Sequence, residues 1–315
     1  MIRAAVIGAG AMGANHARVY SELENATLVA VSDINPDAKK IAEKYDAAFY
    51  TDYKEMLDKE KPDAVSICVP TTLHFPIAKD TLSAGIHTLV EKPITETTGH
   101  AQQLIELAKS KNLKLMVGHI ERFNPVVKEI KDKIKGEKIL SINIHRVGPQ
   151  PPRVKDVGII MDLGTHDIDL SSYITNSKVK KLFCSAQNTD AHEDSAMIIL
   201  GLEGDIPISI TTNWLTPYKL REVEVVTEKR LLKADLIGQV IKEYTKSTSK
   251  ENTSYDWNED TLPYQEPLKL ELESFISSVE QDTEPEITGE DGLNVLKIAL
   301  LCIESAKKKE ILNAD

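Results

Sequence analysis

The chain has 315 residues, with 49 acidic against 38 basic side chains and a formal net charge of −11. Its length predicts two compact domains, and its 41% hydrophobic content is enough for two sizeable cores. The negative balance argues against nucleic acid as a partner, and no apolar run approaches the ~20 residues that span a membrane. Three widely separated cysteines, together with a first strand that leaves no room for a signal peptide, indicate reduced thiols and a cytoplasmic protein.

The chain opens on an apolar run at residues 3–7 that leads into a glycine-rich turn and then a helical pattern. Gly8 permits a tight turn, and Gly10 lets the backbone approach a pyrophosphate without a Cβ in the way. Gly13 lets the helix pack closely on the strand, so that the helix N-terminus faces the negative charge. The expected contacts to a dinucleotide are therefore those of Gly8, Gly10, Ala11, Met12 and Gly13.

A second apolar strand, residues 27–32, ends in Asp33. A carboxylate at this point accepts hydrogen bonds from the adenosine ribose hydroxyls and repels a 2′-phosphate. The following Ile34 and Asn35 supply no arginine to offset that repulsion, so the sequence predicts NAD rather than NADP. The alternative is an ordinary glycine turn in an α/β fold, with an aspartate that caps a helix.

Strand and helix patterns then alternate as far as Gly118. Helices are predicted from residue 36 through 42, at 53–59, 75–84 and 97–110, and strands at 47–50, 64–69, 87–90 and 113–117. With the first two strands this makes six, which predicts a Rossmann domain over residues 1–118. Ligands bind such a doubly wound parallel sheet at the carboxyl ends of its strands.

Beyond residue 118 the pattern changes to successive strands, predicted at 139–147, 180–187, 195–202, 208–213 and 222–227. Helices are expected at 125–135, 158–174, 267–278 and 292–308, and the polar stretch 247–260 is expected to be a mobile excursion. Residues 119–315 are therefore predicted to form an α+β domain with an open, mainly antiparallel sheet, which binds substrate and mediates oligomerisation.

Three further motifs lie at strand ends or on a predicted helix: Glu91-Lys92-Pro93, the octapeptide from Gly118 to Pro125, and the segment from Asp162 to Asp169. Together with the glycine turn, they resemble the Gfo/Idh/MocA family, named for glucose–fructose oxidoreductase, inositol dehydrogenase and rhizopine catabolism. The resemblance covers essentially the whole chain. It implies an NAD-dependent oxidoreductase and assigns catalytic roles to Lys92, Asp162 and His166.

The chemistry of these three side chains is suited to removing a hydride and a proton from a carbinol. Asp162 and His166 are four residues apart and project from one helix face, where the carboxylate orients the imidazole that takes the proton. Lys92 brings an ammonium that stabilises the alkoxide or shares the proton. The alternatives are a solvated lysine, a surface Asp/His pair, or a metal half-site with His119 as third ligand. We expect no metal, since Lys92 would place a positive charge beside it.

The resemblance also implies that Thr71 and His74 contact the cofactor ribose or pyrophosphate, and that Glu91 contacts the nicotinamide ribose. Thr71 alternatively caps a helix. The other histidines belong to no evident constellation and are expected to be structural or exposed: His16, His87, His100, His145 and His192.

The octapeptide after the sixth strand resembles the branch of the family that acts on nucleotide sugars, particularly on UDP-N-acetylglucosamine. By this resemblance, substrate contacts fall to His119, Arg122 and Asn124. Arg122 alternatively pairs with Glu121 or Asp162, and Arg153 is a second candidate for the diphosphate.

The reaction that the resemblance implies is NAD-dependent oxidation at C3 of UDP-N-acetylglucosamine. A 3-keto sugar suits a downstream PLP aminotransferase, which is therefore a candidate partner. The alternatives are an inositol or free-sugar dehydrogenase, an NAD-dependent glycosidase, and a regulator without catalysis. An open sheet that needs covering predicts a homodimer or homotetramer.

Overall fold

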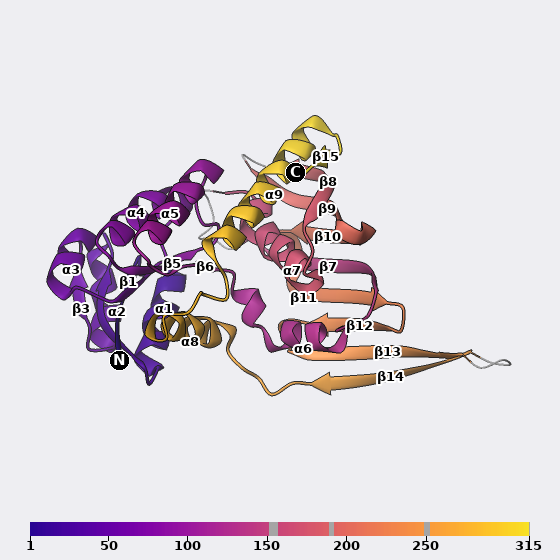
Figure 1. The fold of residues 1–315 in the computed structure, drawn as a ribbon, viewed down its shortest axis with the longest axis horizontal. Coiled ribbons are helices and arrows are strands. Elements are labelled where there is room, and N and C mark those ends of the chain that lie inside the picture. Colours follow the sequence, from indigo (N-terminus) through magenta and orange to yellow (C-terminus); the bar gives the residue numbers. More distant parts are fainter. Residues whose placement is uncertain (151–156, 189–191, 249–252, 315) are drawn as a thin grey trace. The chain divides into compact units, whose positions relative to one another are not determined.

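The computed structural model describes residues 1–150, 157–188, 192–248 and 253–314. The chain forms two compact units (Figure 1). The first comprises Met1–Ile120 and Leu268–Leu296, and the second comprises Glu121–Pro267 and Lys297–Asp315. The first unit thus takes in a C-terminal segment that the sequence analysis assigned to the second domain, because the apolar residues of that segment are buried in the first unit.

The first unit is built on a parallel sheet in the strand order β3-β2-β1-β4-β5-β6. Its strands are β1 (Ile2–Ile7), β2 (Ala26–Ser32), β3 (Ala48–Tyr50), β4 (Ala64–Ile67), β5 (His87–Glu91) and β6 (Leu115–Gly118). Every residue of β4 is buried, as expected for a central strand covered on both faces. The order and direction of the strands confirm the predicted Rossmann domain.

Helices connect these strands and cover the sheet (Figure 1). They are α1 (Ala11–Glu22), α2 (Lys39–Lys44), α3 (Tyr53–Glu60), α4 (His74–Ser83), α5 (Thr98–Ser110) and α8 (Pro267–Glu280), with short 3₁₀ turns η1 (Pro36–Ala38), η2 (Thr71–Leu73) and η3 (Ile120–Phe123). Side chains of Asp52 and Thr97 accept hydrogen bonds at the starts of α3 and α5. Helix α8 lies beside α1, where its Glu271 interacts electrostatically with Tyr20.

The second unit is built on a mixed sheet in the order β14-β13-β12-β11-β7-β10-β9-β8-β15. The strands are β7 (Ile139–Pro149), β8 (Val179–Asn188), β9 (Glu193–Leu202), β10 (Pro207–Asn213), β11 (Leu215–Thr227), β12 (Arg230–Asp235), β13 (Val240–Thr248), β14 (Thr253–Thr261) and β15 (Leu312–Asn313). Within the described residues, β7 and β10 are the parallel neighbours and the other pairs are antiparallel. This confirms the open, mainly antiparallel sheet.

Helices pack on one face of this sheet. They are α6 (Pro125–Lys133), a π-helical turn η4 (Ile160–Gly164) that continues into α7 (Thr165–Thr175), and the C-terminal part of α9 (Gly289–Lys308). Alternate residues of β7, including Ile142 and Ile144, are buried beneath α7. Among the described residues, no helix combines the length and apolarity needed to cross a membrane.

The prediction of a mobile excursion over residues 247–260 is wrong. Most of this segment forms β14 and the end of β13, which pair in register from Val240 to Thr261 (Figure 1). Residues 254–259 of β14 are all exposed, and polar side chains dominate the strand, although Tyr255 and Trp257 alternate with polar neighbours. An edge strand held by backbone hydrogen bonds needs no buried apolar face, so the polar composition misled the prediction.

Candidate active site

The glycine turn between β1 and α1 has the geometry that its sequence predicts. Gly8 has φ +87°, and a Cβ on Gly13 would lie 1.7 Å from the carbonyl oxygen of Gly8. Only a glycine at position 13 therefore allows α1 to start so close to β1. By contrast, a Cβ on Gly10 would meet nothing within 4 Å, so the space beside Gly10 is open. The first-turn N–H groups of α1, which have no intrahelical acceptor, start at this open space.

Asp33 follows β2 and braces the same turn. One carboxylate oxygen accepts a hydrogen bond from the N–H of Ala9 at 2.6 Å, and the other accepts from Asn35 at 2.8 Å. The side chain is half-buried, so the carboxylate keeps accepting capacity for further donors. An open anion cradle beside a carboxylate at the end of β2 fits the pyrophosphate and ribose of NAD.

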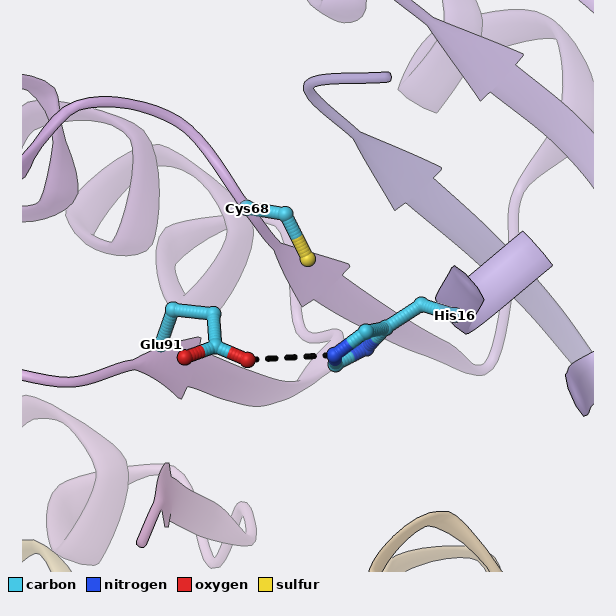
Figure 2. A group of neighbouring side chains, drawn as sticks. All are labelled: His16, Cys68 and Glu91. Atoms are coloured by element: carbon cyan, nitrogen blue, oxygen red, sulfur yellow. Dashed lines mark hydrogen bonds and ion pairs between the residues drawn. The ribbon is translucent and has the colours of Figure 1, made fainter. Parts of the chain in front are cut away.

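Glu91, at the end of β5, belongs to a cluster with His16 of α1 and Cys68, which follows β4 (Figure 2). His16 Nε2 lies 3.1 Å from Glu91 Oε1. Burial raises the pKa of Glu91, but the hydrogen bond from His16 and the charges of Lys92 and His74 outweigh it and hold the pKa below its usual value. The sequence analysis assigned His16 to no group of functional residues, whereas the structure shows that its partner is Glu91.

The same cluster offers one ligand atom from each of His16, Cys68 and Glu91 within 4.8 Å of one another. Two of these groups already share a hydrogen bond. Burial and the nearby carboxylates Glu91 and Glu271 raise the pKa of the Cys68 thiol well above its usual value, which disfavours the thiolate that a metal binds. The geometry is that of a hydrogen-bonded cluster at the cofactor edge of the sheet.

Thr71 and His74 lie after β4, where the cofactor is expected to cross the sheet. Thr71 begins η2 and caps neither that turn nor α4, so the capping alternative does not hold. His74 is buried, with Nδ1 2.8 Å from the carbonyl oxygen of Pro93 and Nε2 2.9 Å from that of Val69. Burial lowers its pKa. His74 thus joins the segments that follow β4 and β5, and its predicted contact with the cofactor stays a prediction.

Lys92 directly follows β5 and is half-buried, and His119 follows β6 and is 1% exposed. Both side chains interact with other residues of the structure. The two positions are at the carboxyl ends of neighbouring parallel strands, because Glu91 pairs with Gly118. This is the sheet edge at which a doubly wound fold binds its ligands.

In the second unit, Asp162 lies in the π-turn η4 and His166 in the first turn of α7. Residues four apart remain on one side of the helix across such a turn, and single π-turns often mark functional sites. Asp162 is 5% exposed, and His166 is half-buried. The helix therefore presents a shielded carboxylate and a more accessible imidazole on one face.

Arg122 and Asn124 are engaged within the second unit. The Arg122 guanidinium contacts both Asp169 carboxylate oxygens at 2.5–3.0 Å and lies over the Tyr173 ring, 5.0 Å from its centre. Asn124 caps α6 through the N–H of Val126 and donates to the carbonyl oxygen of Leu236. Asp169 is thus a partner of Arg122 that the sequence analysis did not predict. Their predicted contacts with substrate remain predictions.

A buried network of ion pairs joins α7 to strand β7 of the sheet. Arg146 of β7 donates to Asp167 of α7 and to Glu121, each at 2.7 Å. Burial raises the pKa of Asp167 to about 6, although Arg146 opposes this shift. The chain thus anchors the helix that carries His166 to the sheet through a charge pair that water does not reach.

Arg221 is a candidate that sequence reasoning missed. It pairs with Arg146 across β11 and β7, contacts Glu121 at 3.4 Å, and interacts electrostatically with Asp162. Its side chain is 41% exposed, unlike that of Arg146. No motif marks Arg221, because its contacts depend on the pairing of β11 with β7. Arg153, predicted to bind the diphosphate, lies outside the described residues.

Comparisons with known proteins identify both parts of the chain. Residues 2–119 match the profile of an oxidoreductase family with an NAD-binding Rossmann fold, GFO/IDH/MocA. Residues 135–233 match the GFO/IDH/MocA C-terminal domain. The match to the first profile confirms NAD as the cofactor.

Similar proteins cover nearly the full length. The UDP-N-acetylglucosamine 3-dehydrogenase of Acidithiobacillus ferrooxidans is 27% identical over 305 residues, which are 95% of each chain. The myo-inositol 2-dehydrogenase of Thermotoga maritima is 26% identical over 324 residues, covering 98% of this chain and 96% of the relative. A crystal form of the Acidithiobacillus enzyme aligns with a TM-score of 0.90 at 25% identity, over 98% of both chains.

Proposed function

The chain belongs to the GFO/IDH/MocA oxidoreductase family, and from this premise we propose that it oxidises the C3 carbinol of UDP-N-acetylglucosamine with NAD, giving the 3-keto nucleotide sugar. Bound NAD supplies a hydride acceptor. The remaining chemistry falls to the chain: the hydroxyl proton must be removed, the developing alkoxide stabilised and the sugar oriented.

Lys92, Asp162 and His166 divide this work in the proposal. His166 takes the hydroxyl proton, because it is the more accessible of the two helix side chains and an imidazole is the side chain suited to accepting a proton near neutral pH. Asp162 orients the ring and stabilises the imidazolium. Lys92 provides positive charge to the alkoxide oxygen.

The observation that carries the proposal is that the first unit has groups suited to binding NAD and the second has groups suited to proton transfer. The first unit has an open anion cradle at Gly10 with a carboxylate beside it, and the second has Asp162 one turn before His166. A regulator that only binds NAD would need no such acid–base pair.

A nucleotide sugar as substrate is supported by the likeness to the Acidithiobacillus enzyme and by the arginine side chains of the second unit. With Arg122 engaged by Asp169, we assign the diphosphate to Arg221 and Arg153, and keep Asn124 and His119 as sugar contacts. A guanidinium that is 41% exposed and near Asp162 suits a phosphate oxygen. A 3-keto sugar is a substrate for amination, so the proposed next enzyme is a PLP-dependent aminotransferase.

Oxidation of inositol is the second candidate. It is favoured by the Thermotoga relative, which matches at 26% identity over nearly the same length. A cyclitol has no diphosphate, so this candidate predicts no role for Arg221 in substrate affinity.

Turnover assays decide between the two. The purified chain is incubated with NAD and UDP-N-acetylglucosamine, myo-inositol or glucose, and the absorbance of reduced cofactor is followed. We expect net reduction with the UDP-sugar. Reduction with inositol alone would replace the proposed substrate, and none with any CH–OH substrate would overturn the assignment.

The catalytic roles are tested with Lys92→Ala and His166→Ala. Each is expected to lower kcat by about 10²–10⁴-fold, the range for lost acid–base or charge stabilisation, while NAD affinity is retained. His145→Ala is the matched control, because His145 lies on β7 outside the proposed site. Parent turnover in Lys92→Ala would show that the active-site assignment is wrong.

A further inference from the structure

The side chain of Glu91 is fixed from two directions. His16, fully buried on α1, lies with Nε2 3.1 Å from Glu91 Oε1 (Figure 2). Because a carboxylate only accepts, Nε2 is the donor. The second oxygen, Oε2, accepts from the backbone N–H of Lys92 at 3.3 Å. One carboxylate thus links α1 to the start of the segment that carries the catalytic lysine.

Space for this carboxylate is built into the next strand. Gly118 of β6 pairs with Glu91, and a Cβ on Gly118 would lie 3.2 Å from both the carboxyl carbon and Oε2. A side chain at position 118 would therefore press on the carboxylate, which would have to shift by a few tenths of an ångström. The Glu91 side chain is 12% exposed, so its edge remains accessible to a ligand at the end of β5.

The hydrogen bond from His16 goes to Glu91 and not to the neighbouring buried acid, Glu271. Glu271 of α8 is also completely buried and interacts with Glu91 electrostatically, yet neither of its carboxyl oxygens has a hydrogen-bond partner among the described residues. A donor that holds one of two neighbouring carboxyl groups selects which of them faces the ligand.

We propose that His16 is a positioning residue for the nicotinamide end of NAD. It fixes the Glu91 carboxylate so that Oε1 and Oε2 keep one orientation, in which Glu91 binds the ribose next to the nicotinamide. The inference rests on the proposed NAD-dependent function and on the contact with the nicotinamide ribose that the sequence analysis predicted for Glu91, and it extends that contact to a helix residue that acts only through Glu91.

Binding measurements without sugar test this inference apart from the proposed reaction. NAD and ADP are titrated calorimetrically into the parent chain and into His16→Phe, which keeps a ring but has no donor. Since ADP lacks the second ribose, we expect about a tenfold or greater loss of NAD affinity, the worth of one hydrogen bond to a charged group, and unchanged ADP affinity. His16→Gln, whose amide N–H reaches in the same direction, is expected to recover most of the NAD affinity.

A double-mutant cycle shows whether His16 acts through Glu91. Glu91→Gln is expected to weaken NAD but not ADP, and adding His16→Phe to it should cause no further loss. Glu271→Gln is the matched control, a buried glutamate outside the cluster that makes no hydrogen bond to Glu91 among the described residues, and its replacement is expected to leave NAD affinity unchanged.

Three results would overturn the inference: equal losses for NAD and ADP in His16→Phe, additive losses in the double variant, or full NAD affinity in Glu91→Gln. None of them bears on the proposed reaction, which turnover of UDP-N-acetylglucosamine by the parent chain decides. If circular dichroism shows that His16→Phe is unfolded, His16→Asn takes its place in the cycle, because this amide is smaller and too short to reach Glu91.

Discussion

Asp33 illustrates how one side chain at the site combines structure and recognition. Its carboxylate accepts the N–H of Ala9 inside the glycine turn and that of Asn35 after β2. We propose that the same negative charge disfavours a 2′-phosphate on the adenosine ribose. Its loss therefore has two consequences, and a pair of substitutions separates them.

Asp33→Asn keeps an acceptor for Ala9 and removes the charge, whereas Asp33→Ala removes both. We expect both variants to narrow the preference for NAD over NADP by about tenfold or more, as expected for the loss of a charged hydrogen-bonding partner. Only Asp33→Ala should also lower the melting temperature. The ratio of kcat/KM for the two cofactors checks this, and an unchanged ratio in both variants would contradict the role of Asp33.

Glu271 makes stability depend on pH in a definite direction. Burial, and after it the charge of Glu91, raise the pKa of Glu271 well above the ordinary value of a glutamate. The native state therefore keeps a proton that the unfolded chain releases, so stability falls as pH rises from about 4.5 toward the native pKa. A neutral Glu271→Gln variant lacks this loss.

We expect the advantage of Glu271→Gln over the parent to grow by about 1.4 kcal/mol for each pH unit within that window. Urea unfolding at pH 5, 6, 7 and 8 measures it. A variant that becomes less stable than the parent as pH rises would show that Glu271 is ionised in the native state.

At the candidate site, motifs predicted the elements on which the candidate residues lie but not what these residues contact. The end of β5 and the first turns of α7 were found from local patterns that carry their own chemistry. The His16–Glu91 bond and the Arg122–Asp169 pair join residues 75 and 47 positions apart in the chain. Such contacts depend on which helix face meets which strand, and a single sequence does not fix that.

At the scale of elements, the close packing of α1 on β1 restricts the residues that the glycine turn of the first unit can contain. A Cβ on Gly13 would lie 1.7 Å from the backbone oxygen of Gly8, so there is no space for a side chain there. A Cβ on Gly10 would meet no atom within 4 Å. Two glycines of one motif therefore serve different ends: one permits packing and the other leaves room for a ligand.

Gly13→Ala is expected to destabilise the protein by at least about 3 kcal/mol, because α1 must move off the sheet. Gly10→Ala should leave the melting temperature unchanged and weaken NAD, because its methyl group enters the open space beside the turn. Thermal unfolding with and without NAD checks both. Equal melting temperatures for the two variants would contradict this division.

Element prediction succeeded best where a long apolar face is buried. Buried strands such as β4 and amphipathic helices such as α8 were located closely, because one face or both must be apolar. Strands β12 and β13 were missed, although Leu232 and Ala234 of β12 alternate as buried residues, because so short an alternation is weak evidence for a strand. Strand β14 was taken for a loop because it is the exposed edge of the sheet. Pairing by backbone leaves little trace in side-chain composition.

On the scale of the whole molecule, the sheet of the second unit leaves apolar side chains in water. On β9, Met197 is 62% exposed and Ile199 is 54% exposed, two residues apart on the same face. We propose that this face mediates a homodimer or homotetramer, since an apolar sheet surface of this kind is normally covered.

Sedimentation velocity should show an assembly larger than one chain, and Met197→Glu with Ile199→Glu should shift it toward the monomer, because two buried charges would be left unpaired at the interface. Ser209→Glu on the neighbouring strand is less informative, since Ser209 is already polar. A parent chain that sediments as a monomer at all concentrations would exclude this assembly.

The most direct test of the account is the fate of the hydrogen at C3 of the sugar. UDP-N-acetylglucosamine carrying deuterium at C3 is incubated with the chain and NAD, and the mass of the reduced cofactor is measured by mass spectrometry. The proposed reaction predicts that one deuterium appears in the reduced cofactor. Reduced cofactor without deuterium would show that a different carbon is oxidised and would contradict the proposal.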